Sequence, residues 1–183
     1  MKNNGQNHKL FHSFCLYPEV RFETQENKED VILVLRAHPV TQIYWLLNGL
    51  FFILILILLN YFISSFLNPS QTFFLNIFGI IFIFSYFWLN FLNWFFNVGV
   101  ITSKRIIDID FHGVIYKEVT EACLNRVEDI TSKSGGYFQS LFDYGNVFIQ
   151  TAGNEANIEF LNIPYPSQVV TKINELLGKN HGY

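Results

Sequence analysis

The sequence is poor in charge, and from residue 37 to residue 103 it contains no Asp, Glu, Lys or Arg. Over all 183 residues only 15% are charged, whereas 50% are hydrophobic and 18% are aromatic. An ordinary soluble domain has about 25% charged residues. This composition excludes a uniformly soluble fold and indicates that the charge-free block lies in an apolar environment.

The sequence also has few cysteines, and its basic residues do not outnumber its acidic residues. The two cysteines, Cys15 and Cys123, lie far apart with no CxxC spacing, which favours reduced cytosolic thiols over a disulfide framework. Twelve basic residues against 15 acidic residues give a formal net charge of -3. A chain without a basic field does not neutralise the phosphates of a duplex, so nucleic acid is not an expected partner.

Motifs for phosphate binding and nucleophilic catalysis are missing. Gly135-Gly136 is not followed by Lys-Ser or Lys-Thr and does not fit the G-x-G-x-x-G spacing. Asp108 and Asp110 share one strand face, where a carboxylate pair serves acid-base or metal chemistry. Alternation along a strand more often places such residues on its solvent side, and we adopt that interpretation. We therefore expect no enzyme activity.

A metal site is a weak alternative in the N-terminal tail. His8, His12 and Cys15 have a spacing that suits a metal ion on a helix, but a fourth ligand is missing. We expect no metal and no cofactor.

Two apolar runs fill the charge-free block, at about 43–67 and 73–98, and each exceeds the ~20 residues that cross a bilayer. Asn68-Pro69-Ser70-Gln71 separates them as a turn. In the first run 17 residues are Leu, Ile or Phe, and each favours the membrane by about 0.3 to 0.6 kcal/mol. Residues 1–30 are too polar for a signal peptide. The sequence predicts two transmembrane helices within residues 41–98.

The basic residues nearest to these runs lie on their terminal sides. Lys28 and Arg36 precede the first run, Lys104 and Arg105 follow the second, and the connecting turn has none. Positive side chains are retained on the cytoplasmic side. We therefore expect a multi-pass protein of the inner membrane with both termini in the cytoplasm.

Asparagines are prominent among the polar residues of the two runs. At about 1.5 Å per residue, Asn48 comes level with Asn90 and Asn93 in a hairpin, and Asn60 comes level with Asn76 near the outer end. Amides bond across membrane helices, so we expect the first group to be in contact and the second to form a looser level, within the hairpin or between copies. A water-filled path is less favoured because neither run contains an ionisable side chain.

Beyond the second run the apolar pattern changes from helical to alternating. A hairpin is expected on either side of His112-Gly113, with further strands at 126–132, 145–151 and 157–161. Residues 166–177 place their apolar side chains on one helical face. The predicted fold is an α+β membrane protein: a cytoplasmic segment at 1–40, the helical hairpin, and a small antiparallel β domain at 99–183 with a C-terminal amphipathic helix.

The order of several short motifs resembles the bacterial pleckstrin-homology-like domain family of small membrane proteins. They are Val100-Ile101-Thr102-Ser103-Lys104-Arg105-Ile106-Ile107 after the two runs, a Gly113 hairpin, Asn125-Arg126-Val127-Glu128-Asp129-Ile130, Asp143-Tyr144-Gly145-Asn146-Val147 and Thr151-Ala152-Gly153. The resemblance covers roughly residues 31–178. It implies a partly open β sandwich or barrel closed by the C-terminal helix, and it supplies no catalytic residues.

The favoured function is non-enzymatic: a membrane anchor whose pleckstrin-homology-like module binds a protein, or a second copy of the chain, at the inner membrane surface. One alternative is anionic-lipid sensing by Lys104 and Arg105, which follow the second run closely and which Lys117 and Arg126 would join in space. Residues 97–183 carry seven basic and ten acidic side chains, so topology is the favoured role of that pair. Another alternative is a subunit of an export or pore complex.

Overall fold

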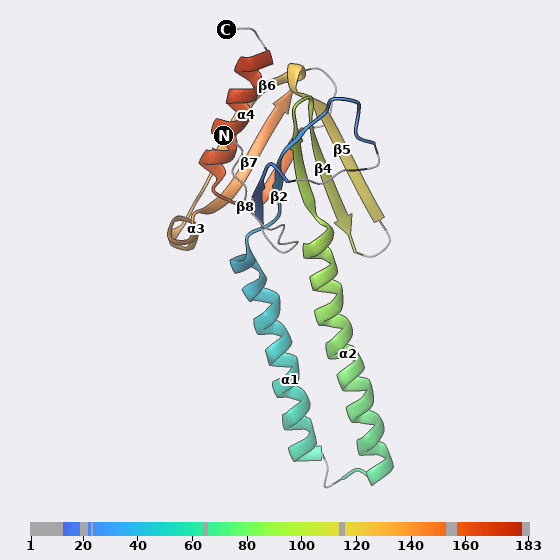
Figure 1. Ribbon diagram of the computed structural model, residues 1–183. Coiled ribbons are helices and arrows are strands. Elements are labelled where there is room, and N and C mark those ends of the chain that lie inside the picture. Colours follow the sequence, from blue (N-terminus) through green and yellow to red (C-terminus); the bar gives the residue numbers. More distant parts are fainter. Residues whose placement is uncertain are drawn as a thin grey trace.

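The protein is described by a computed structural model that covers residues 13–18, 22, 24–63, 66–113, 116–152 and 157–180. Two antiparallel sheets and a C-terminal helix form a β domain, and a pair of long helices extends from one end of it (Figure 1). The α+β class predicted from the sequence is therefore present.

The long helices are α1 (Ile43–Ile63) and α2 (Pro69–Phe96), and a short 3-10 helix, η1 (Pro39–Gln42), leads into α1. Both are long and apolar enough to cross a membrane. The expected turn at residues 68–71 is instead the first turn of α2, because Gln71 Oε1 accepts a hydrogen bond from the Asn68 amide at 3.0 Å and Pro69 suits the first helical position.

The second helix ends earlier than expected, at Phe96. Asn97 leaves the helical conformation, and its Oδ1 accepts a 2.7 Å hydrogen bond from the Phe111 amide in the sheet. That bond joins the end of the helix directly to the β domain.

The first sheet has five strands in the order β1-β2-β3-β4-β5, all antiparallel. These are β1 (Phe14–Leu16), β2 (Val31–Leu35), β3 (Val98–Thr102), β4 (Arg105–His112) and β5 (Tyr116–Cys123). Leu33 of β2 pairs with Ile101 of β3, although both long helices separate them in the sequence. The helix pair is thus an insertion between two neighbouring strands.

This pairing changes the expected boundaries of the β domain. Residues 1–40 were expected as a separate segment and residues 99–183 as the domain, but β1 and β2 belong to the same sheet as β3. The run Val31–Leu35 is apolar, and four of its five residues are buried. On one side it pairs with β1, and on the other side it needs β3 and the core residues that lie beyond α2.

The second sheet has three strands, β6 (Val127–Lys133), β7 (Tyr144–Thr151) and β8 (Ile158–Pro164), in sequence order. A short 3-10 helix, η2 (Leu124–Arg126), connects the two sheets, and α4 (Pro166–Asn180) follows β8. The apolar face predicted for the C-terminal helix is buried, since Val169 and Ile173 have no exposed surface. The core lies between α4 and the sheets and includes Leu33, Leu35, Ile101, Ile106, Val147, Ile149 and Ile158.

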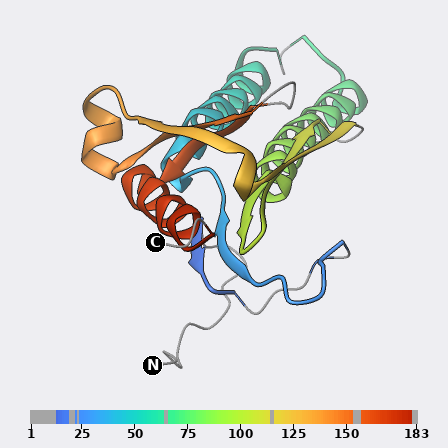
Figure 2. The same ribbon diagram turned by 90° about the horizontal axis from the view of Figure 1, so that it is seen from above.

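A short helix that the sequence analysis did not predict, α3 (Tyr137–Phe142), lies between β6 and β7. Gly136 precedes it with φ +92°, a conformation that other residues rarely adopt, and Asp143 ends it in the left-handed region. In Figure 1 and in the view from above in Figure 2, α3 projects sideways from the β domain.

Candidate functional site

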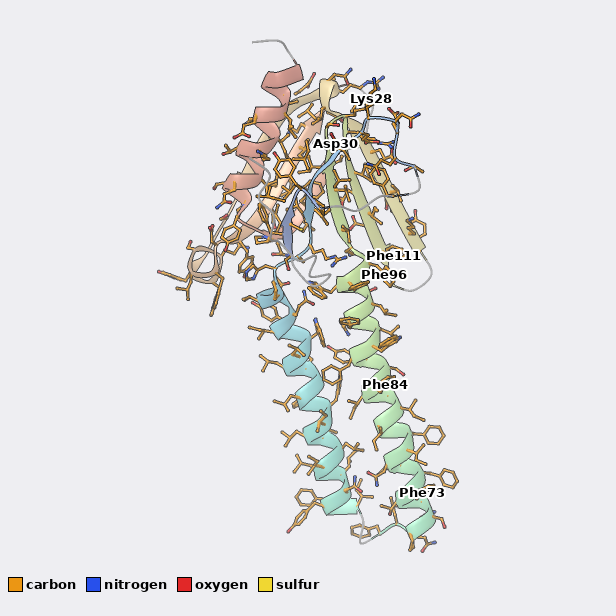
Figure 3. All side chains as sticks on the ribbon, viewed as in Figure 1. Lys28, Asp30, Phe73, Phe84, Phe96 and Phe111 are labelled. Atoms are coloured by element: carbon orange, nitrogen blue, oxygen red, sulfur yellow. The ribbon has the colours of Figure 1, made fainter. Side chains whose placement is uncertain are left out.

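The β domain has two polar ends, which we call the helix-proximal end and the distal end. The helix-proximal end is where α1 begins and α2 stops, and the distal end consists of the β3–β4 turn and residues 24–30. Figure 3 shows Phe96 and Phe111 at the first and Lys28 and Asp30 at the second. The five residues of β3 connect the two ends over roughly 16 Å, at about 3.3 Å per residue.

Lys104 and Arg105 lie at the distal end. Their place in the sequence predicts a position close to the end of the second helix, within reach of lipid head groups. Because β3 runs directly away from α2, the structure carries them to the opposite end of the sheet. Of the two further basic residues considered for the lipid-sensing alternative, Lys117 lies at the other end of β5, with its Nζ 6.0 Å from the centre of the Phe111 ring. Arg126 lies in η2.

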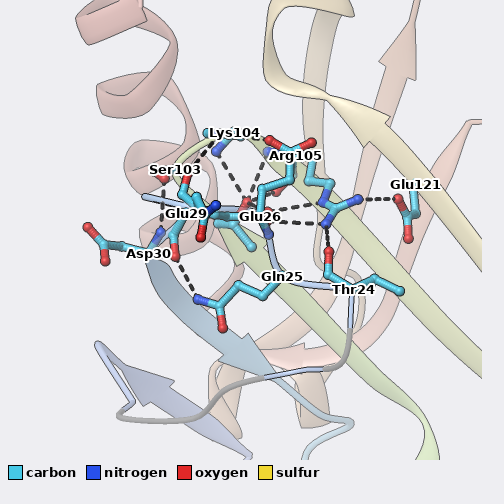
Figure 4. Close-up of polar contacts among 11 residues, drawn as sticks. Thr24, Gln25, Glu26, Glu29, Asp30, Ser103, Lys104, Arg105 and Glu121 are labelled. Carbon is cyan, nitrogen blue, oxygen red and sulfur yellow. Dashed lines mark hydrogen bonds and ion pairs between the residues drawn. The ribbon is translucent and has the colours of Figure 1, made fainter.

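The Arg105 guanidinium is held by two carboxylates and one carbonyl (Figure 4). Its Nε and Nη2 donate to Glu29 at 3.0 and 3.2 Å, its Nη1 donates to Glu121 at 2.8 Å, and Nη2 also donates to the Thr24 carbonyl at 2.6 Å. Opposite charges on both sides keep the pKa of Arg105 above its usual value, chiefly through the hydrogen bond to Glu29. These bonds fasten the segment before β2 onto β4.

Glu29 is the buried centre of this distal cluster, and its side chain has no exposed surface. Its carboxylate also accepts bonds from the Thr102 hydroxyl at 2.7 Å and the Glu26 amide at 2.9 Å. Burial by itself raises the pKa of Glu29, but the hydrogen bonds from Arg105, Glu26 and Thr102 together lower it below its usual value. A carboxylate with four donors is a structural lock.

Lys104 is the exposed basic residue of the cluster. Its Nζ forms a 2.7 Å ion pair with Glu26, and both side chains are largely exposed. Lys104 and Arg105 thus face three carboxylates, those of Glu26, Glu29 and Glu121. This arrangement neutralises the two basic residues within the protein and makes a poor site for an anionic ligand.

The helix-proximal end contains a cavity of about 240 Å³ between the two sheets. Its polar lining residues are Arg36, Asn97, Asp108, Asp110, Glu159 and Asn162. Asp108 and Asp110 share the face of β4 that carries the buried Ile106, so they point inward and are only partly exposed. The expectation that they lie on the solvent side is wrong, because the inner face of β4 continues past the core into this cavity.

Charge in the cavity is unevenly balanced. Burial, followed by repulsion from Asp110, raises the pKa of Asp108 to about 7, and Glu118 on β5 adds to this effect. Burial also lowers the pKa of Arg36, whose guanidinium lies 4.8 Å from the centre of the Phe95 ring. The cavity can therefore bind or release a proton near neutral pH.

A metal site is not present among the described residues, since no group of three or more His, Cys, Asp or Glu side chains is placed to hold an ion. His8 and His12 lie outside the described part of the chain.

The comparison with known sequences decides the family. The sequence model described as "Bacterial PH domain" matches residues 39–177. The chain belongs to the bacterial PH domain family. No curated protein matches it. Among solved structures it is similar to a DUF1696 family protein with a pleckstrin-homology domain from Shewanella loihica PV-4, with 18% identity over 45% of this chain and 68% of that chain and a TM-score of 0.33.

The match to the bacterial PH domain family includes both long helices and begins after β2. Glu29, which locks the distal end, therefore lies outside the matched residues. Glu29, Thr102 and Glu121 were not predictable as a cluster from the sequence, because their partners are separated from them by up to 76 positions. A weak signal was available, namely an acidic residue just before an apolar strand.

Within the helix pair, Asn60 and Asn76 are brought together. Each side-chain amide donates to the other side-chain oxygen at 2.8 Å. Each also donates to the carbonyl four residues before it, at 2.8 Å from Asn60 to Leu56 and 2.9 Å from Asn76 to Thr72. The level that we expected to be looser is thus a reciprocal amide pair.

The expected contact of Asn48 with Asn90 or Asn93 is not formed in the described structure. Asn48 is exposed, and the neighbouring Gly49 is the buried residue that faces Phe87. The Asn90 amide donates to its own helix, to the Tyr86 carbonyl at 2.8 Å. Aromatic pairs fill the space between the helices at this level, Trp45 against Phe87 and Phe52 against Tyr86. Asn93 is partly buried and makes no hydrogen bond with Asn48.

Proposed function

We propose that the protein is a non-enzymatic, membrane-anchored PH module that binds a protein partner, or a second copy of itself, at the inner surface of the cytoplasmic membrane. In this proposal α1 and α2 span the bilayer and both termini lie in the cytoplasm. The supporting observation is that the helix pair is inserted between β2 and β3 with very short connections, from Leu35 to Pro39 and from Phe96 to Val98.

The two connections are also tied together. Trp94 Nε1 at the end of α2 donates to the Ala37 carbonyl at 2.9 Å, and the His38 amide donates to the Asn162 carbonyl of β8 at 2.7 Å. A domain held at both connections has little freedom to move away from its helices. Any partner that it binds must therefore be met beside the membrane, which favours a role at the membrane surface.

Charge placement favours a protein partner over lipid sensing by Lys104 and Arg105. A lipid reader needs basic side chains that are free and close to the head groups, and each basic residue there contributes about 1 kcal/mol. Lys104 and Arg105 are paired with carboxylates at the distal end. A role as a pore subunit has less support, because the amides of Asn60 and Asn76 bond to each other and to their own helices.

The orientation is tested by cysteine labelling in intact cells. Cys123 is exposed on the β domain, and Ser70 lies in the first turn of α2. A reagent that does not cross membranes should label a Ser70→Cys variant that lacks both native cysteines, and should leave wild-type Cys123 unlabelled until the cells are opened. Labelling of Cys123 from outside contradicts the topology.

Partner binding is tested by photo-crosslinking in the same cells. A photoreactive residue at Val119, which is exposed on edge strand β5, should give discrete protein adducts, at twice the chain mass if the partner is a second copy. Phe78, exposed on α2, is the matched control within the span. Adducts at Phe78 together with none at Val119 would assign the interaction to the helices.

A further inference from the structure

The exposed surface of α3 is almost entirely apolar. The exposed fractions are 96% for Tyr137, 68% for Phe138, 75% for Leu141 and 41% for Phe142. No charged residue occurs from Ser134 to Phe142. Gln139, a polar residue, is the least exposed of this helix. An ordinary surface helix turns its polar residues outward, so α3 has the reverse arrangement and marks an interaction surface.

The apolar surface is held in place by its own polar contacts. The Gly135 amide donates to Gln139 Oε1, and the Ser140 hydroxyl donates to the Gly136 carbonyl at 3.2 Å. The Asp143 carbonyl accepts a 2.8 Å bond from the amide of Tyr165, the residue before α4. The aromatic side chains are therefore presented outward by an ordered helix.

The position of α3 is close to the point where α1 begins. The ring of Tyr144 stacks on His38 with 5.5 Å between the ring centres, and His38 directly precedes Pro39, the first residue of the apolar span. Phe142 is two residues before Tyr144, so their Cα atoms are at most about 7.6 Å apart. α3 lies to the side of the helix pair in both views, and Figure 1 shows it at the helix-proximal end of the β domain.

We propose that Tyr137, Phe138 and Leu141 insert into the interfacial layer of the bilayer that α1 and α2 span. Aromatic side chains favour this layer, which extends about 5 to 8 Å on each side of the hydrocarbon core. The inference rests on the proposed membrane anchoring. Lipid is favoured over a protein partner because α3 lies beside the start of the span. The contact supplements the two chain connections and sets the tilt of the β domain.

The absence of charge in α3 defines the chemistry of the contact. Insertion is driven by apolar surface, so zwitterionic lipid is sufficient and anionic head groups are not required. Lipid recognition by charge, as considered for Lys104 and Arg105, predicts the opposite dependence.

The test uses the full chain reconstituted in phosphatidylcholine vesicles, with Cys15 and Cys123 replaced by Ser. Single cysteines at Leu141→Cys, Phe78→Cys and Lys28→Cys carry an environment-sensitive fluorophore. We expect nitroxide lipids to quench the label at position 141 several-fold more than the label at position 28, and aqueous iodide to show the reverse order. Adding phosphatidylglycerol should leave the quenching at position 141 unchanged.

The two controls separate the possible failures. Phe78 is 68% exposed on α2 and reports the membrane span, whereas Lys28 is exposed at the distal end. If nitroxide lipids quench the label at position 78 but quench the labels at positions 141 and 28 equally, α3 does not insert into the bilayer, although α1 and α2 still anchor the protein. If position 78 is not quenched, the anchoring itself fails. A label at position 141 that is shielded from both quenchers is covered by protein, which also overturns lipid insertion.

Discussion

The two ends of the β domain each withdraw a carboxylate from water, and the two carboxylates respond in opposite ways. Glu29 at the distal end receives hydrogen bonds from a guanidinium, a hydroxyl and an amide, and its pKa is lowered. Asp108 at the helix-proximal end has Asp110 and Glu118 nearby, and its pKa is raised to about 7. Burial is common to both, so the difference comes from the hydrogen-bond donors around Glu29 and the neighbouring carboxylates around Asp108.

The comparison indicates a division of roles between the two ends. A carboxylate that is charged and satisfied by donors fixes one arrangement of the chain, and Glu29 thereby ties the N-terminal segment to the sheet. A carboxylate surrounded by other carboxylates makes the region sensitive to pH instead. The distal end therefore holds the N-terminal segment on the sheet, whereas the helix-proximal end contains a carboxylate whose charge changes near neutral pH.

Removing the partner of the fastened carboxylate should have the largest effect. Arg105→Ala leaves the buried Glu29 without its guanidinium, and breaking such a pair costs about 3 to 5 kcal/mol. The free energy of unfolding in detergent, followed by hydrogen exchange of β2, measures the loss. The contribution of Glu29 is present above its unfolded pKa and is lost as pH falls through its lowered folded pKa, so the variant and wild type should converge in acid. A loss that is independent of pH would contradict this account.

Replacing Asp108, the carboxylate at the helix-proximal end, should instead increase the stability of the protein. Between pH ~4 and pH ~7 the folded state keeps the Asp108 proton that the unfolded chain has released, so the stability of the wild type falls as pH rises through this window. Asp108→Asn removes this penalty and should stabilise the protein by about 2 to 4 kcal/mol above pH 7 and hardly at all near pH 4. Thermal unfolding across this pH range is the measurement.

The cavity provides the control for this variant. Asp110, Glu118, Glu159 and Arg36 are the other charged groups around Asp108. Asp110→Asn should lower the pKa of Asp108 and so give a smaller stabilisation in the same direction. Equal stabilisation by Asp108→Asn at pH 4 and pH 8 would show that charge is not the cause.

Helices and strands of this fold were predictable from the sequence where the spacing of apolar residues within the element itself defines them. The helix pair, the β4–β5 hairpin and the apolar face of α4 follow from the pattern of neighbouring residues, and the structure contains all three. The place of β2 in the sheet was not predictable in the same way. Its partner is β3, beyond both helices, and a short apolar run does not specify a partner so far away.

The polar features depended still more on three-dimensional placement. Alternation assigned Asp108 and Asp110 to one face correctly but did not say which face is inward, because Ile107 on the other face is also buried, at 4% exposure. Likewise, counting residues from the helix ends correctly matched Asn60 with Asn76. For Asn48 this count is not enough, because the side chain must also point toward the other helix. Gly49 allows the close approach of Phe87 and so turns Asn48 outward.

A smaller loss of stability is expected from breaking the Asn60–Asn76 pair, in which two uncharged amides join α1 to α2. Asn60→Leu leaves the Asn76 side-chain oxygen without its donor, and such interhelical bonds contribute about 0.6 to 2 kcal/mol. The double variant Asn60→Leu/Asn76→Leu should lose no more than the single variant, because no amide is left unmatched. Unfolding of the helix pair in mixed micelles, arranged as a double-mutant cycle, measures the coupling. Additive losses would mean that the pair does not interact.

Cross-linking sharpens the same prediction. In a chain without native cysteines, Asn60→Cys with Asn76→Cys should form an intrachain disulfide readily. Asn48→Cys with Asn90→Cys should not, because aromatic rings separate the helices at that level. Ready intrachain bonding of the second pair would restore the contact that the sequence alone suggested.

The smallest effect is expected from Lys104→Ala, although Lys104 is adjacent to Arg105 in the sequence. Its ion pair with Glu26 at 2.7 Å is exposed on both sides, with exposed fractions of 44% and 58%. Exposed pairs contribute about 0 to 1 kcal/mol and are screened by salt. The same unfolding measurement should therefore give a small loss for Lys104→Ala that disappears at high ionic strength, while the loss for Arg105→Ala persists. If the two variants lose equal stability at high salt, burial does not distinguish the two basic residues, and the distal cluster acts as a surface charge network.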